Sequence, residues 1–186
     1  MLADTGSKWY ALEQDMSLTG RWYLSQQLLP GQGIWDHLRT DADSASQTRC
    51  FGYRREGKQL DFTLGDFDVP VVSEAFAKSL GEVAGGDVSF SPAKIEGANG
   101  QFFVLRVTHI IDAIDEARSE LETLSPDELR QRRGSRYRSI QRLVVNQEAL
   151  QGHCVARLEG WKIPILVDAE AARAVKPFSG VLLRPV

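Results

Sequence analysis

The sequence has few cysteines, no long apolar run and no large excess of either charge. Its 186 residues include two cysteines, Cys50 and Cys154, too few for a disulfide framework, and we expect both to be free, buried thiols. No segment approaches the roughly 20 apolar residues of a membrane helix. Residues 1–15 show no basic stretch followed by an apolar one, so we expect no signal peptide. These absences predict a cytoplasmic protein that does not bind membranes.

The charge balance argues against a general nucleic-acid binder. Lys and Arg total 22 and Asp and Glu total 25, which gives a net charge of −3 where such a binder would show a basic excess. A hydrophobic fraction of 42% and a charged fraction of 25% are typical of a globular chain. We expect residues 1–186 to form a single domain, with 1–98 and 99–186 as candidate sub-halves.

Common catalytic motifs are also missing. The chain contains no phosphate-binding Gly-x-x-x-x-Gly-Lys-Ser/Thr loop, no His-Glu-x-x-His, no Cys-x-x-Cys and no Gly-x-Ser-x-Gly. The three histidines, His37, His109 and His153, lie far apart in the sequence and have no ligand spacing. We therefore predict no catalytic residue, no metal site and no cofactor.

Several segments have the composition of β-strands. Aromatic residues favour short strands at 9–12 and 22–24, and the segments 50–53 and 60–64, with a turn at 56–58, predict a β-hairpin. The strongest strand signal covers residues 101–115. One of its faces is apolar and the other is mixed, as in a sheet that is fully buried on one side. His109 falls on the apolar face, and we expect a hydrogen-bonded core histidine there.

Two helix starts are recognisable. Ser73 can cap a helix over 73–81, and Ser125 can cap another because Glu128 completes a capping box. The segments 69–92 and 163–185 also share the order strand, helix, strand, either by internal symmetry or by chance, and Asp168 is a candidate cap at the position that corresponds to Ser73. These features predict an α+β fold: a mixed, largely antiparallel sheet with a few helices and two pseudo-equivalent strand-helix-strand units.

Charge is concentrated in two adjacent blocks. Residues 112–128 contain seven acidic residues and one arginine, a net charge of −6, and residues 129–142 contain six arginines and no acid, a net charge of +6. Two interpretations stay open. The blocks pair with each other on a solvated surface, or they form a polarised surface that steers a charged partner.

The order and spacing of several segments resemble a known family. These segments are 20–24, 60–62, 69–73, 90–92, 110–115 with 119–120, 134–137, 143–145, 156–158 with Trp161, 163–168 and 180–185. The series is similar to the myxobacterial-type immunity protein domain, immunity protein family eleven of bacterial polymorphic toxin systems, over about residues 9–186. In one departure, the family often has Phe before Arg157, where this chain has Ala156.

The resemblance implies an immunity protein that binds and neutralises a toxin encoded nearby, often a nuclease, without being an enzyme. Since a nuclease needs a basic substrate groove, acidic side chains could mimic its phosphate ligand, and an exposed Trp could anchor the contact. The candidate partner-binding residues are Trp35, Asp41, Asp43, Asp66, Asp68, Asp112, Asp115, Glu116, Glu120 and Glu122. We expect no nucleic-acid partner, and a protein that is a monomer or a homodimer.

Two other functions stay open. The aspartate pairs Asp41 with Asp43 and Asp66 with Asp68 could hold a divalent cation in a metal-dependent hydrolase, although such pairs are common in solvated loops. A small-ligand-binding regulatory domain would need a deep apolar pocket with convergent polar groups.

Overall fold

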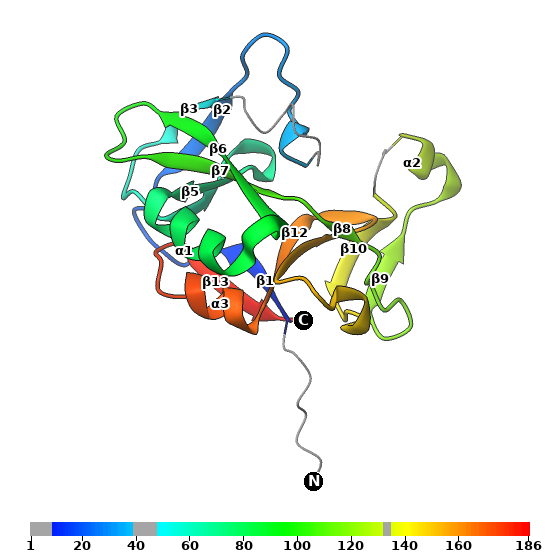
Figure 1. The fold of residues 1–186 in the computed structure, drawn as a ribbon. Helices are drawn as coiled ribbons and strands as arrows, with labels where there is room; N and C mark the ends of the chain where they lie inside the picture. Colours follow the sequence, from blue (N-terminus) through cyan, green and yellow to red (C-terminus); the bar gives the residue numbers. More distant parts are fainter. Residues whose placement is uncertain (1–8, 39–47, 132–134) are drawn as a thin grey trace.

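The computed structural model describes residues 9–38, 48–131 and 135–186. It confirms the predicted α+β class: two large, largely antiparallel sheets, a two-stranded ribbon and three α-helices lie in these residues (Figure 1). Within the described residues, no helix is long and apolar enough to cross a bilayer. Neither cysteine is in a disulfide, and both are half-buried rather than buried.

The larger sheet has six strands in the order β2-β3-β6-β7-β5-β4. All neighbours are antiparallel except β3 and β6, which run parallel. In chain order its strands are β2 (Tyr23–Gln27), β3 (Arg49–Arg55), β4 (Phe62–Leu64), β5 (Pro70–Ser73), β6 (Val88–Ile95) and β7 (Phe102–Val107). Helix α1 (Glu74–Ala84) joins β5 to β6, and short 3₁₀ turns are formed by Asp36–Leu38, Asp66–Asp68 and Gly85–Asp87.

The second sheet has five strands in the order β13-β1-β12-β11-β8, and a separate ribbon pairs β9 with β10. Its strands are β1 (Trp9–Gln14), β8 (Ile110–Ile111), β11 (Val155–Leu158), β12 (Trp161–Asp168) and β13 (Val181–Pro185). The ribbon consists of β9 (Glu120–Thr123) and β10 (Tyr137–Arg142), with helix α2 (Pro126–Gln131) between them. Helix α3 (Ala169–Val175) joins β12 to β13, and Glu148–Leu150 forms another 3₁₀ turn.

The predicted internal symmetry is present. Strands β5 and β6 flank β7 and are antiparallel to it, and in the same way β12 and β13 flank β1. Each unit is thus a split β-α-β arrangement with one antiparallel strand inserted. The inserted strand follows the first unit in the chain but precedes the second, so the two units share an arrangement and differ in connectivity.

The two units bury one common core. Helices α1 and α3 lie side by side (Figure 1), and Ser79 of α1 donates a hydrogen bond to the carbonyl of Ala174. Phe76 and Leu80 from α1 share this core with Val175 of α3 and with residues of both large sheets. Burial of this apolar area is the main stabilising contribution, since each fully buried large side chain contributes about 1.5–3 kcal/mol.

Helix starts follow the predicted caps. Ser73 accepts a hydrogen bond from the Phe76 amide at 3.3 Å, and Asp168 caps α3 by accepting from the Glu170 and Ala171 amides. Ser125 and Glu128 form the predicted capping box at α2.

Two strand predictions are wrong in detail. Segments 50–53 and 60–64 do not form a hairpin, because β3 pairs with β2 and β6 whereas β4 pairs with β5. The segment 101–115 is also not one strand with a solvated face. It breaks after Val107, and both faces of β7 are covered by separate hydrophobic cores, so that even Arg106 is buried.

Candidate functional site

The two charged blocks come together in a ribbon that projects from the body of the protein (Figure 1). We call residues 112–131 and 135–142 the charged arm. Strand β9 supplies acids and β10 supplies arginines, and the antiparallel register places Arg142 opposite Glu120 and Ser139 opposite Glu122. Opposite charges on neighbouring strands stabilise such a pair.

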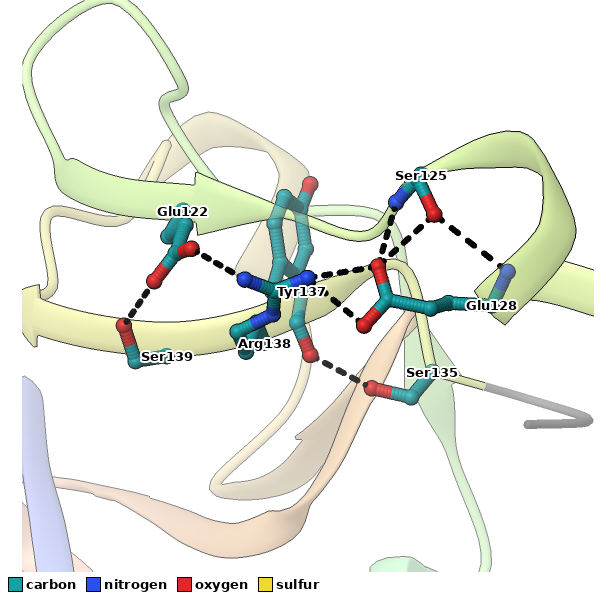
Figure 2. Close-up of polar contacts among 7 residues, drawn as sticks. All are labelled: Glu122, Ser125, Glu128, Ser135, Tyr137, Arg138 and Ser139. Atoms are coloured by element: carbon teal, nitrogen blue, oxygen red, sulfur yellow. Dashed lines mark hydrogen bonds and ion pairs between the residues drawn. The ribbon is translucent and has the colours of Figure 1, made fainter.

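Ion pairs connect the acidic block to the basic block. Arg142 lies 2.9 Å from Glu120, and Arg136 lies 3.3 Å from Asp112. Arg138 lies between two carboxylates, at 2.7 Å from Glu122 and 2.6 Å from Glu128 (Figure 2). The shortest of these contacts are typical of charge-assisted hydrogen bonds.

Glu128 joins the helix cap to this network. Its carboxylate accepts hydrogen bonds from the backbone amide and hydroxyl of Ser125 and from Arg138 (Figure 2). These bonds, led by the Ser125 amide, lower the pKa of Glu128 to about 2. The capping box predicted from the sequence therefore also fixes α2 against the β10 arginine.

Tyr137 links two segments of the arm. Its ring is fully buried, and its hydroxyl donates a 2.5 Å hydrogen bond to the Glu116 carboxylate. Burial, followed by this bond to Glu116, raises the pKa of Tyr137 to about 12. The tyrosine is thus a protonated donor at neutral pH.

Every acid of the block 112–128 has a partner. The remaining pairs are local, with Arg118 at 2.6 Å from Asp115 and Arg130 at 3.4 Å from Asp127. The interpretation in which the two blocks pair with each other is therefore confirmed for the described residues. Arg132 and Arg133 of the basic block and Gly134 lie outside these residues. Of the predicted partner-binding residues, Asp112, Asp115, Glu116, Glu120 and Glu122 lie in this network.

A second exposed surface is aromatic. Trp35 is 48% exposed and Phe67 is 44% exposed, and their rings pack edge to face with centroids 5.7 Å apart. Phe67 and Asp68 both have left-handed backbone conformations, with φ values of 60° and 56°. A bulky residue rarely adopts this conformation, and such strain is concentrated at functional sites.

A groove reaches the same turn at Asp68, the residue that follows Phe67. It has a volume of about 520 Å³ and is lined by Asp68, by the exposed side chains of Met16 and Ile163, and by residues of β1 and β12. We call Met16, Trp35, Phe67, Asp68 and Ile163 the Trp35–Phe67 surface. Large exposed apolar side chains that lie together indicate an interaction site more strongly than isolated ones do.

The aspartates near this surface are not a solvated pair. Asp66 is mostly buried, forms a 2.5 Å ion pair with Arg54 and accepts a hydrogen bond from the Gln26 amide. Asp68 is half-buried and raises the pKa of Arg157, opposing the effect of burial. The two carboxylates thus interact with different cations. Asp41 and Asp43 lie outside the described residues.

Two buried side chains near this surface, Arg157 and His37, were not predicted from the sequence. Arg157 is 1% exposed and donates to the carbonyls of Lys162 and Ile163, while its Nε and Nη2 have no hydrogen-bond partner among the residues that the structure describes. Burial lowers its pKa to about 10. His37 is also buried, and burial together with the charges of Arg157 and Arg49 lowers its pKa to about 3, so His37 is neutral at physiological pH.

The prediction for His109 was wrong. The His109 side chain is 43% exposed rather than buried in the core, because β7 ends at Val107. Its imidazole lies 4.4 Å from that of His153, measured between ring centroids, and both rings face Asp87. His153 lies 66 positions after Asp87 and 44 positions after His109. Sequence spacing alone therefore does not reveal that these three side chains meet.

Comparison with known protein families gives a match. A model of the immunity protein family (Imm11) matches residues 12–181. No match is found among curated proteins. The matched range contains the charged arm, the Trp35–Phe67 surface and most of both split β-α-β units. Residues 9–11 of β1 and 182–185 of β13 lie outside it.

Proposed function

This chain belongs to the Imm11 immunity protein family, and from this premise we propose that it binds one cognate toxin stoichiometrically and blocks its activity. The family match covers nearly the whole chain and implies toxin neutralisation. The observation that carries the binding mode is the exposed Trp35–Phe67 pair, in which Phe67 stands on a strained turn whose next residue, Asp68, lines a groove.

The Trp35–Phe67 surface has the features of an interaction hot spot. Aromatic anchors near the centre of an interface supply most of its binding energy when the partner excludes water from them. Trp35 and Phe67 are rigid rings that support each other, so that little side-chain entropy is lost when they are covered. The groove, lined by Met16 and Ile163, would accept an apolar side chain of the toxin.

The charged arm is the second candidate surface. Its arginines largely cancel the field of its acids at a distance, so the arm is a poor mimic of a phosphate backbone. We propose that Asp112, Asp115, Glu116, Glu120 and Glu122 instead orient the toxin at close range by exchanging ion-pair partners. If the toxin is a nuclease, its basic groove would supply the new partners.

We propose that the protein acts as one domain in the cytoplasm of the cell that makes the toxin, as a monomer or a homodimer. The core shared by α1, α3 and both large sheets supports a single domain. Strand β1 lies in one sheet with β12 and β13, so a division at residue 98 would separate strands that pair directly.

Co-expression with the product of the adjacent toxin gene tests the function. We expect cells to survive, and the purified proteins to form a 1:1 or 2:2 complex by light scattering after size exclusion. Cells killed despite soluble expression of this protein, or toxin that elutes alone, would contradict the proposal. A non-cognate toxin of the same activity class serves as the control for specificity.

A further inference from the structure

Three polar side chains from separate segments converge outside both surfaces described above. Asp87 ends the 3₁₀ turn after α1, His109 lies between β7 and β8, and His153 precedes β11. One ligand atom from each residue lies within 4.8 Å of the others. Two imidazoles and one carboxylate form a donor set that binds transition-metal ions such as Zn²⁺.

The distances fit a tetrahedral ion. Asp87 Oδ1 lies 3.0 Å from Nδ1 of His153 and 3.5 Å from Nε2 of His109. Ligand atoms bound to Zn²⁺ at about 2.0–2.1 Å in tetrahedral geometry lie about 3.3 Å from one another. The two measured separations lie on either side of this value, so small side-chain movements would complete the coordination.

A hydrogen-bond network without an ion accounts less well for the arrangement. A single oxygen, Oδ1 of Asp87, faces both imidazoles, and the 3.5 Å separation to His109 is long for a hydrogen bond. One ion between the three groups would satisfy both ring nitrogens and the shared oxygen together.

Backbone contacts hold the three residues in place. The second oxygen of Asp87 accepts hydrogen bonds from the amides of Cys154 at 2.6 Å and Val155 at 3.2 Å. The Thr108 amide donates to the Asp87 carbonyl, and the Arg157 amide donates to the His109 carbonyl, each at 2.9 Å. Contacts that orient a ligand in this way are typical of metal sites.

One side of the cluster is open to solvent. The side chains of His109, His153 and Asp87 are 43%, 27% and 11% exposed, respectively. A metal ion could therefore enter without unfolding the chain, and water would occupy the fourth position. Ca²⁺ and Mg²⁺ prefer all-oxygen ligand sets, so the two imidazoles favour Zn²⁺, Co²⁺ or Ni²⁺.

We propose that Asp87, His109 and His153 form a binding site for a divalent transition-metal ion of the zinc class. The site joins the end of the β5-α1-β6 connection to the segments before β8 and β11 of the other sheet. A bound ion would therefore hold the two large sheets together and stabilise the folded protein. This proposal does not depend on the identity of the toxin.

Titration of the full-length chain, prepared without a polyhistidine tag, tests the site. With Co²⁺ we expect visible d–d absorption of a tetrahedral complex, and with Zn²⁺ a Kd in the micromolar range or tighter by calorimetry. Zn²⁺ at about 100 times Kd should raise the Tm by about 5 to 10 °C. Binding no tighter than about millimolar would overturn the proposal.

Two variants locate the site. His109→Gln should weaken Zn²⁺ binding by at least about 100-fold, and so should His153→Gln, each with loss of the Co²⁺ absorption. His109 is the more informative of the two because its side chain is the more exposed, so its replacement should preserve the fold. Asp127→Asn, an exposed acid in α2, is the matched control and should bind Zn²⁺ as the wild type does. Unchanged affinity in both histidine variants would place the metal elsewhere and refute the site.

Discussion

The charged arm and the Trp35–Phe67 surface are both exposed, but their charges are arranged in opposite ways. In the arm the charges are on the outside and each acid of the block 112–128 has a partner. At the Trp35–Phe67 surface the exposed groups are largely apolar, and guanidinium groups such as that of Arg157 are buried beneath them. The comparison teaches that a charge-rich sequence block need not be the surface that offers free charge or binding energy to a partner.

The sharpest way to break this comparison is to remove the two aromatic anchors. We expect Trp35→Ala combined with Phe67→Ala to cost about 4 kcal/mol of toxin binding, roughly a 1,000-fold rise in Kd, because each is a candidate hot spot. Calorimetric titration with the toxin measures this change. Leu182→Ala, an exposed apolar residue of β13 outside both surfaces, is the control and should change Kd by less than about threefold. A double variant that binds as tightly as the control would remove this surface from the interface.

The next largest effect concerns what holds the two segments of the arm together. We expect Tyr137→Ala to lower the free energy of unfolding by about 3 kcal/mol because it empties a buried site. Tyr137→Phe removes only the hydrogen bond to Glu116 and should cost about 1 kcal/mol. Urea denaturation measures both values. An equal loss in the two variants would mean that the polar contact, and not the ring, holds the two segments together.

Local signals in the sequence predicted the arm well. The capping box at Ser125 and Glu128 and the opposite charge blocks concern residues close together in the chain, and these contacts are present. The split units were predicted in outline because each contains a capped helix between strands. The sequence pattern did not show that β7 and β1 insert between those strands, since pairing partners come from distant segments.

The second surface and the histidine cluster depend on long-range contacts. Trp35 was predicted as an anchor, but its partner Phe67 and the strained turn were not, because a left-handed Phe leaves no signal in a single sequence. Arg157 was noted only within a segment that resembles the family, and its buried side chain reflects the pairing of β11 with β12, whose Lys162 and Ile163 carbonyls it contacts. His109 was misplaced because the strand period was extended beyond the actual end of β7.

We expect mild acid to lower stability through the buried His37, whose ring lies beside that of Trp35, and not through the charged arm. The pKa of His37 is lowered to about 3 in the folded state, below its ordinary value of 6.5. The neutral form therefore contributes stability above pH 6.5, and this contribution is lost as the pH falls from 6.5 towards 3. At pH 5 the loss should reach about 2 kcal/mol.

Chemical denaturation at pH 7.5 and pH 5 measures this loss. In His37→Leu the difference between the two pH values should shrink by that amount. His109→Gln, which removes an exposed histidine, should retain the wild-type difference. If the difference persists in His37→Leu, the buried histidine is not the acid-sensitive group.

The smallest effect is expected in the arm. The pKa of Glu128 is lowered to about 2 from an ordinary 4.5, so the charged form contributes stability above pH 4.5 that is lost as the pH falls through about 2. In an NMR titration the Ser125 amide, which donates to Glu128, should therefore report a midpoint near 2. In Arg138→Gln the pH midpoint of the Ser125 amide should move upward but stay below 4.5, because the bonds from Ser125 persist.

The urea midpoint of this variant should be close to that of the wild type, since exposed ion pairs contribute little to stability. A large fall in the urea midpoint would contradict this expectation and show that the ion pairs of Arg138 stabilise the fold.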